Sequence, residues 1–127
     1  MLGSYPAIVT LTAFDLTRAE NFYTKVVGLK QVDLPGVPDT SMFEAGKGTQ
    51  VVIYKSDAAK PEQTSAIFSV DDIESAVDSL SSKGVAFEQY DYDGLKTDAR
   101  GIAAMGGAAK SAWFKDTEGN TISIVSM

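Results

Sequence analysis

Alternation of side-chain types is the first regular pattern in the chain. From residue 7 to residue 14, one face of an extended segment carries small polar as well as apolar side chains, while the other face carries only apolar ones. This alternation predicts a strand. Apolar residues then recur at helical spacing between Leu16 and Val27. Asp15 suits the N-cap of this helix, and Gly28 suits the position just past its end. The chain therefore opens with a strand and a helix.

Three further strands are predicted in the first half, at residues 29–34, near 41–45 and at 50–55. The sequence Gly46-Lys47-Gly48 supplies the turn between the last two. The next stretch, about residues 57–63, is polar and contains Pro61, which is typical of a linker. The first half thus reads as strand, helix and three strands.

The same pattern returns in the second half. Residues 66–70 predict a strand, Asp72 suits a helix N-cap, Gly84 suits the helix end, and residues 85–90 predict another strand. When Asp72 is set on Asp15, the apolar positions of the two helices coincide, and Gly84 falls within one residue of the position of Gly28. The repeat period is therefore about 57 residues, one supersecondary unit used twice.

The second half contains an insertion and ends in a hairpin. Trp113 and Phe114 favour a strand, residues 116–120 supply turn chemistry around Gly119, and residues 122–125 form a second strand. Residues 91–109, before this hairpin, are rich in Gly and Ala, and we expect them to form a mobile loop over the sheet. Two such modules would give eight strands and two helices.

Composition narrows the possible functions. The chain has 127 residues, a net charge of −6 and no Lys/Arg cluster, which argues against nucleic acid or a membrane as partner. It contains no Cys and no His, so thiolate catalysis, Ser-His-Asp triads and the commonest metal ligand are excluded. No apolar run approaches the length of a membrane span, and the N-terminus lacks the pattern of a signal peptide. We therefore expect a cytoplasmic protein.

Three motifs together resemble the vicinal-oxygen-chelate superfamily, which includes glyoxalase I, bleomycin-resistance proteins, fosfomycin-resistance enzymes and extradiol dioxygenases. They are Asp15-Leu16-Thr17-Arg18-Ala19-Glu20-Asn21-Phe22-Tyr23 followed by Gly28-Leu29, then Val70-Asp71-Asp72-Ile73, and then Trp113-Phe114-Lys115-Asp116-Thr117-Glu118-Gly119-Asn120. Thr117 stands where Pro is commoner in the family. The motifs span nearly the whole chain in the family's order and spacing.

The resemblance implies an α+β fold of two βαβββ modules whose mixed sheets curl into an open barrel around a ligand cavity. Module 1 would cover about residues 6–56, the linker about 57–63, and module 2 about 64–127 with the inserted loop at about 91–109. All of these would lie in a single domain of residues 1–127.

The resemblance also implies where the family's enzymes hold a divalent metal. Transferred onto this chain, the ligand positions fall on Ile8, Ser65 and Ser123, and near Val52. Hard and borderline cations need carboxylate, imidazole or several carbonyl oxygens, which these side chains do not offer. We therefore expect no metal at this site and no other cofactor.

Without a metal, the implied cavity still needs an occupant, and the strand alternation predicts which side chains face it. Hydroxyls and an indole can hold a planar or weakly polar ligand by hydrogen bonding and stacking. The predicted ligand-binding residues are Thr10, Thr12, Tyr54, Ser65, Ser69, Tyr90, Ser111, Trp113 and Ser123. The alternative is that the small residues fill the core of a closed barrel and that the tyrosines are half-buried packing.

Carboxylates are the remaining candidates for chemistry. Asp91 and Asp93 lie two residues apart, and two close carboxylates can serve as a general acid and a general base. A solvated acidic turn is the favoured interpretation of this pair. Glu44 and Glu88 sit in predicted strands, where an outward position on a solvated face is the default.

Three functions are compatible with these patterns. The favoured one is a metal-independent binding protein of the glyoxalase/bleomycin-resistance type that sequesters or carries a small aromatic or amphiphilic ligand. The second is a lyase, isomerase or dioxygenase of the superfamily that uses displaced carboxylates such as Glu44, Asp91 or Asp93 as metal ligands. The third is a regulatory module whose acidic surface or loop binds a protein. Family members of this size commonly dimerise, so we also predict a homodimer.

Overall fold

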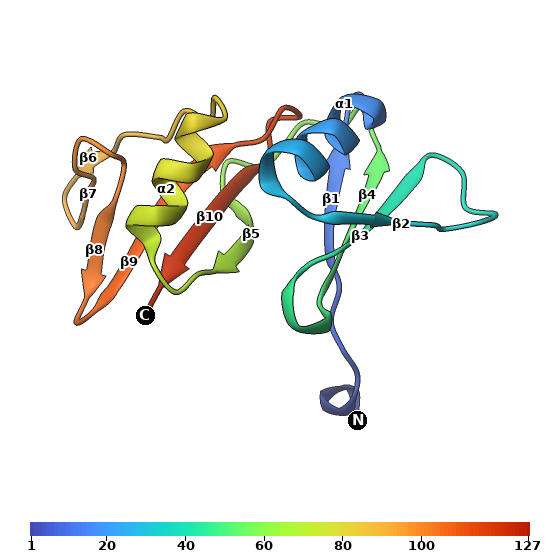
Figure 1. Ribbon diagram of the computed structural model, residues 1–127, viewed down its shortest axis with the longest axis horizontal. Helices are drawn as coiled ribbons and strands as arrows, with labels where there is room; N and C mark the ends of the chain where they lie inside the picture. Colours follow the sequence, from blue (N-terminus) through green and yellow to red (C-terminus); the bar gives the residue numbers. More distant parts are fainter. The chain divides into compact units, whose positions relative to one another are not determined.

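The computed structural model describes residues 1–127, which form two compact units, Met1–Ala59 and Lys60–Met127 (Figure 1). The division between them falls inside the polar stretch that the sequence predicts as a linker. Each unit combines helical segments with a four-stranded mixed sheet. The predicted α+β class with two mixed sheets is thus confirmed. None of the helices combines the length and the hydrophobicity that crossing a membrane requires.

Unit 1 is built on a sheet with the strand order β1-β4-β3-β2. Its strands are β1 (Val9–Ala13), β2 (Lys30–Val32), β3 (Thr40–Glu44) and β4 (Gln50–Lys55), and two short 3-10 helices are η1 (Leu2–Ser4) and η3 (Gly46–Gly48). β1 pairs in parallel with β4, and the other pairs are antiparallel. β1, β3 and β4 match the predicted strands closely, whereas β2 is shorter than the predicted strand at residues 29–34.

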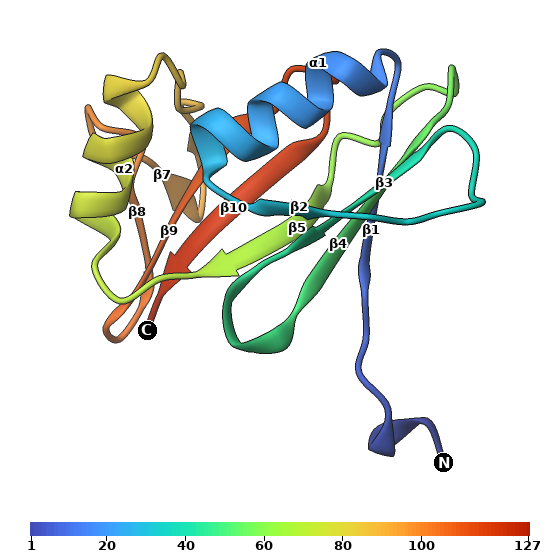
Figure 2. The ribbon, with the colours of Figure 1, turned by 45° about the vertical axis from the view of Figure 1, so that its right-hand side comes forward.

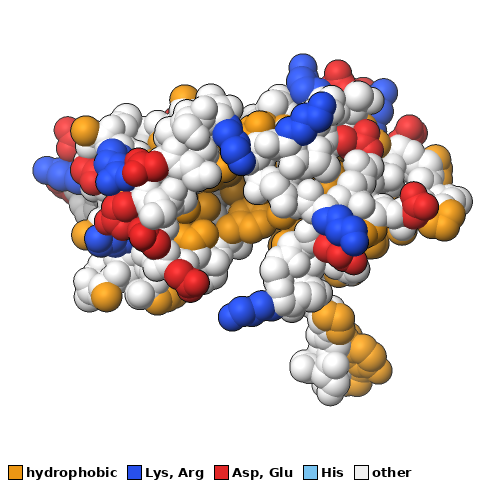
Figure 3. Space-filling model, in the orientation of Figure 1, with side chains coloured by type: hydrophobic (Ala, Val, Ile, Leu, Met, Phe, Trp, Pro, Cys, Tyr) orange, Lys and Arg blue, Asp and Glu red, His pale blue; other side chains and the backbone are white.

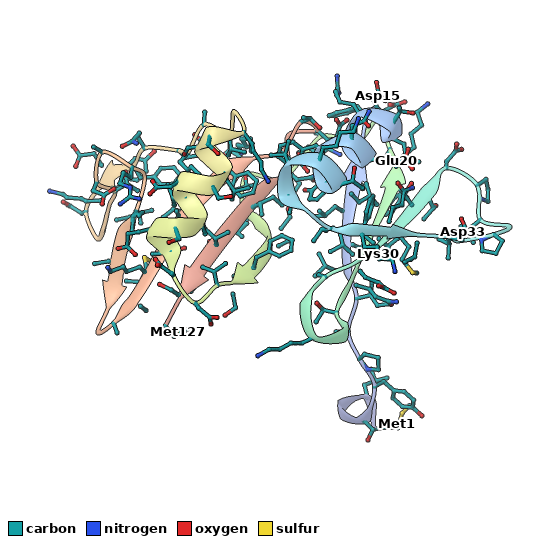
Figure 4. All side chains as sticks on the ribbon, in the orientation of Figure 1. Met1, Asp15, Glu20, Lys30, Asp33 and Met127 are labelled. Atoms are coloured by element: carbon teal, nitrogen blue, oxygen red, sulfur yellow. The ribbon has the colours of Figure 1, made fainter.

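The helical segment of unit 1 begins and ends at the residues that the sequence predicts. The Asp15 carboxylate accepts a hydrogen bond from the Arg18 amide at 3.0 Å and caps α1 (Leu16–Asn21), which continues as a π-helix, η2 (Phe22–Val27). Gly28 closes it in the left-handed conformation, with φ of 89°. The segment runs from the end of β1 to the start of β2 (Figure 2) and packs against β3 and β4. The Glu20 carboxylate on α1, labelled in Figure 4, accepts a hydrogen bond from the Ser41 hydroxyl of β3 at 2.8 Å.

Unit 2 repeats this topology in a sheet with the strand order β5-β10-β9-β8. Its main elements are β5 (Thr64–Ser69), α2 (Ile73–Ser82), β8 (Ala103–Gly106), β9 (Ala109–Lys115) and β10 (Thr121–Ser126). β5 pairs in parallel with β10, as β1 does with β4. The caps Asp15 and Asp72 have nearly the same backbone angles, φ −127° and ψ 103° against φ −131° and ψ 101°. The two units are therefore copies of one motif.

The segment between α2 and β9 differs from the prediction in two ways. Residues 85–90 form no regular strand, and they pair with the sheet through an isolated bridge between Phe87 and Phe114. Residues 91–109 are not simply a loop, because they contain a small hairpin of β6 (Asp91–Tyr92) and β7 (Leu95–Lys96) as well as β8. The physical reason is close approach: Ala103 is fully buried, and Gly101 packs its backbone against Phe87. The small residues that suggested a mobile loop instead let the backbone pack against its neighbours.

Candidate functional site

The sheet of unit 2 has one side covered by α2 and one side facing away from it. The Lys110 ammonium donates to the Glu74 carboxylate of α2 at 2.8 Å, so Lys110 points toward the helix. Because side chains alternate along a regular strand, Ala112 and Phe114 share that side, and Trp113 lies on the other. We call the side away from α2 the open face of unit 2; its residues are Ile67, Ser69, Ser111, Trp113, Lys115, Thr121, Ser123 and Val125.

An aromatic cluster stands on the open face of unit 2. The ring centres of Tyr90 and Trp113 lie 5.4 Å apart at an angle of 75°, and Tyr92 stacks on Tyr90 at 6.0 Å. The Glu88 amide donates to the Trp113 carbonyl oxygen at 2.8 Å and so holds the segment that carries Tyr90 beside β9. Burial raises the pKa of Tyr90, and the negative charge of Glu88 raises it further. The phenol therefore stays neutral and able to donate a hydrogen bond at physiological pH.

Two predicted site residues satisfy each other's hydroxyl groups. Ser111 Oγ and Ser123 Oγ lie 2.8 Å apart, and both side chains are almost fully buried. Ser111 Oγ is also within 3.4 Å of the carbonyl oxygen of Ile124. The pair lies beside Trp113 on the same side of the sheet, since Ser123 is the cross-strand neighbour of Trp113 and Ser111 is two positions before it in β9.

A lysine ammonium lies on the same face as the indole. Lys115 follows Trp113 by two positions in β9, and its ammonium donates to the hydroxyl of Thr121, its cross-strand neighbour. Lys115 is exposed and forms no ion pair within unit 2. The open face of unit 2 therefore combines aromatic rings with a cation whose charge is not neutralised.

The other predicted site residues of unit 2 lie on the edge strand β5. Ser69 pairs with Val125 and is exposed, whereas Ser65 lies where the pairing of β5 with β10 shifts register. The structure therefore brings Tyr90, Trp113 and the serine pair Ser111 and Ser123 together, and places Ser65 and Ser69 on the neighbouring strand.

In unit 1, the three predicted site residues share the side of the sheet that faces away from α1. The Glu20 contact directs Ser41 toward the helix, so the alternate residues of β3 and their neighbours point away from it. Thr12 is the direct neighbour of Tyr54, and Thr10 lies two positions earlier in β1. Tyr54 is 42% exposed, so its ring is accessible. These three residues form a hydroxyl-lined patch within unit 1.

The residues at the family's metal positions do not fit a divalent metal. They are Ile8, Val52, Ser65 and Ser123, none of which carries a carboxylate or imidazole. The chain also contains no group of three or more acidic side chains placed to hold a metal ion. The carboxylates proposed as displaced ligands are dispersed: Glu44 neighbours Lys30 and Gln50 in its sheet, Asp91 lies in β6 near Lys96, and Asp93 lies in the turn after β6.

The side of unit 2 that carries α2 has a different character. Its surface mixes acidic and basic side chains (Figure 3), among them the ion pairs of Lys110 with Glu74 and of Arg100 with Asp78. The hydrogen bond from Lys110 lowers the pKa of Glu74, and the same bond raises the pKa of Lys110. These two ion pairs join charges within the unit, whereas Lys115 on the open face has no ion-pair partner.

The turn that carries the sequence motif is a structural element. One oxygen of Asp116 accepts the amides of Glu118 at 2.9 Å and Asn120 at 2.8 Å, and the other accepts the Asn120 side-chain amide at 2.8 Å. Burial lowers the pKa of the nearby Lys60, while the negative charges of Asp116 and Glu118 oppose that shift. The motif therefore fixes the turn between β9 and β10 and sets the register that places Trp113, Lys115 and Thr121 together.

Two units of identical strand order, each with a capped helix on one side of its sheet, define a protein built from a duplicated α+β motif. A family model described as the Glyoxalase/Bleomycin resistance protein/Dioxygenase superfamily matches residues 6–124. The chain belongs to this superfamily, and the resemblance seen in the sequence is confirmed.

Solved structures share the fold at low sequence identity. The glyoxalase family protein from Enterococcus faecalis has a TM-score of 0.72 at 20% identity, with 98% of this chain and 99% of that chain covered. Lactoylglutathione lyase from Agrobacterium tumefaciens has a TM-score of 0.70 at 21% identity, covering 97% and 93%. Fosfomycin resistance protein FosX from Mesorhizobium loti has a TM-score of 0.65 at 15% identity, covering 97% and 92%. A search of curated proteins gave no match.

Sequence reasoning missed three residues of the open face of unit 2, namely Ile67, Lys115 and Thr121. Lys115 has the same parity as Trp113 in β9, so the alternation that selected Ser111 also selects Lys115. Lys115 also belongs to the motif that carries the family resemblance, and that motif by itself predicts a turn rather than a binding residue. Ile67, which is 63% exposed, has a similar signal, since it shares parity with Ser65 and Ser69.

Proposed function

We propose that this protein is a metal-independent binding protein that holds a small aromatic or amphiphilic molecule. The observation that carries the proposal is the aromatic cluster of Tyr90, Tyr92 and Trp113 on the open face of unit 2. Tyr90 and Trp113 are half-buried and Tyr92 is exposed. Indole and phenol rings offer flat apolar surface together with N–H and O–H donors, which suits planar ligands. The exposed Ile67 adds apolar area in the same cross-strand row as Trp113.

The composition of the family's metal positions supports binding rather than metal-assisted catalysis. Ile8, Val52, Ser65 and Ser123 supply at most two hydroxyls, and Ser123 already bonds to Ser111. A Lewis-acid mechanism needs strong ligands that leave one coordination position open for substrate. These residues cannot provide such a set of ligands, so they do not support a metal-assisted reaction at these positions.

The test is mass spectrometry of the purified protein under native and denaturing conditions, combined with elemental analysis. We expect a small organic molecule that is retained in the native state and released on denaturation, with no stoichiometric divalent ion. The variant Trp113→Ala should lose most of the retained molecule, whereas Phe14→Ala, which removes a 41% exposed ring from outside the predicted site, should retain it. A stoichiometric divalent ion in the wild-type protein would contradict the proposal.

We further propose that the protein acts as a homodimer. The first residues of unit 1 support this, because Met1, Leu2 and Tyr5 are 94%, 75% and 65% exposed and provide apolar surface that a second copy could cover. Edge strands also favour pairing between copies unless they are protected. Sedimentation at micromolar concentration should give twice the monomer mass, and a monomer would contradict this proposal.

A further inference from the structure

Two charged residues, Lys115 and Glu88, lie near Trp113, and the inference from them rests on the proposed function of ligand binding at Trp113. Trp113 and Lys115 are two positions apart in β9, so their side chains leave the same face of the sheet about 7 Å apart. The ammonium of Lys115 has a neutral partner, the Thr121 hydroxyl. A ligand whose ring stacks on the Trp113 indole would therefore have the Lys115 ammonium within reach.

A negatively charged residue, Glu88, lies on the segment beside Trp113. Phe87 bridges Phe114 and packs on its ring, on the side of the sheet that faces α2. The next residue, Glu88, pairs with Trp113 through its amide, and its charge acts on Tyr90, which contacts Trp113. The Glu88 carboxylate forms no ion pair with Lys115. Glu88 therefore lies on the segment next to Trp113, and Lys115 lies two positions further along β9.

We propose that the open face of unit 2 selects small aromatic carboxylates over neutral and cationic aromatics. The ring packs on Trp113 beside Tyr90, and the carboxylate accepts a hydrogen bond from the exposed Lys115 ammonium. Thr121 is only 2% exposed, so its hydroxyl holds that ammonium and does not reach the ligand. The negative charge of Glu88, on the segment next to Trp113, repels the carboxylate and so favours the orientation toward Lys115. A charge-assisted hydrogen bond also compensates the general repulsion that an anion meets from a chain of net charge −6.

The experiment titrates the protein with three probes that share a phenyl ring and chain length: 3-phenylpropionate, its amide and 3-phenylpropylamine. Trp113 is the only Trp in the chain, so its fluorescence reports binding at this face directly. We expect the carboxylate to bind most tightly and the amine most weakly. This ranking is measured on the unmodified protein, so it does not depend on whether a variant folds.

Three variants then locate the charge that sets the ranking. Lys115→Gln should weaken carboxylate binding about fivefold to tenfold and leave amide binding unchanged. Glu88→Gln should strengthen carboxylate binding about twofold, because it removes a repulsive charge. Lys110→Gln is the matched control: it removes the same charge from the other side of the same strand and should leave all three affinities unchanged.

The proposal is overturned if the amide or the amine binds as tightly as the carboxylate, if Lys115→Gln has no effect, or if no probe changes Trp113 fluorescence at millimolar concentration. Failure of the charge ranking with all three probes still bound leaves the proposed binding function intact. A stoichiometric divalent ion in the purified protein would instead contradict the proposed function, whatever the ranking of the probes.

Discussion

The hydroxyl oxygens of Ser111 and Ser123 lie 2.8 Å apart on neighbouring strands, buried at 4% and 2% exposure. The resemblance to the superfamily implies a metal-binding Glu at the position of Ser123, and here a serine forms a neutral hydrogen bond instead. The pair lies next to Trp113, which is the cross-strand neighbour of Ser123.

This serine pair should behave as a coupled unit. Ser111→Ala or Ser123→Ala alone leaves one buried hydroxyl without its best partner and should lower the free energy of unfolding by about 1 kcal/mol. The double variant removes both partners, so its cost should be well below the sum of the two single costs. Urea denaturation of the four proteins measures the coupling, and strictly additive costs would show that the two hydroxyls do not stabilise each other.

Gly101 should control the position of Tyr90. A β-carbon at Gly101 would lie 2.8 Å from the Phe87 β-carbon and 3.1 Å from the Glu88 carbonyl oxygen, and its φ is +87°. Gly101→Ala should therefore cost about 2–3 kcal/mol through strain and overpacking, and should shift Trp113 fluorescence because the segment that holds Tyr90 must move.

Gly94→Ala is the matched control for this prediction. Gly94 has a similar φ of +83° but no atom within 4 Å of an added β-carbon. It should cost only about 1 kcal/mol from backbone strain and leave the fluorescence unchanged. Equal effects of the two variants would show that the contact of Gly101 with Phe87 has no role in placing Tyr90.

Asp116 should be essential for the turn between β9 and β10. Its carboxylate is 6% exposed and accepts three hydrogen bonds from Glu118 and Asn120. Asp116→Ala leaves these donors unsatisfied and should cost about 3 kcal/mol, whereas Asp116→Asn keeps one acceptor oxygen and should cost less. Chemical denaturation ranks the two variants, and an alanine variant as stable as the wild type would contradict the structural role of the motif.

Stability should fall at acidic pH partly through Glu74. The hydrogen bond from Lys110 lowers the pKa of Glu74 in the folded state, so the unfolded state binds a proton first as the pH decreases. The contribution is complete above the ordinary pKa of a glutamate, roughly 4.3, and is lost as the pH falls through the lowered value. Glu74→Gln should flatten the pH dependence of unfolding between about pH 5 and 3, and an unchanged pH profile would contradict it.

The sequence predicted the repeated fold because its signals are local. Asp15 and Asp72 cap helices through their own neighbouring amides, and Gly28 ends its helix in a conformation that few other residues adopt. These signals need no tertiary contact to be recognised. The strand alternation likewise placed Trp113 and Ser123 on one side of the sheet.

The insertion could not be predicted in this way, because its structure depends on contacts that are distant in sequence. Gly101 and Ala103 suggest flexibility when taken alone, but Phe87 and Ser111 give them packing partners. The same limit applies to the candidate site. The contact of Tyr90 with Trp113 depends on the bridge between Phe87 and Phe114, which replaces the regular strand expected at residues 85–90.

The central claim is that this chain binds its ligand without a metal, and chelation tests it most directly. The affinity of the tightest-binding phenyl probe should be measured through Trp113 fluorescence in excess EDTA, and again with added Ni²⁺, Mn²⁺ or Fe²⁺. We expect the same dissociation constant in every condition. We also expect no rise in melting temperature with any metal, because a metal ion that binds only the folded state would raise the melting temperature. Loss of binding in EDTA, with recovery on addition of one of these ions, would contradict the claim.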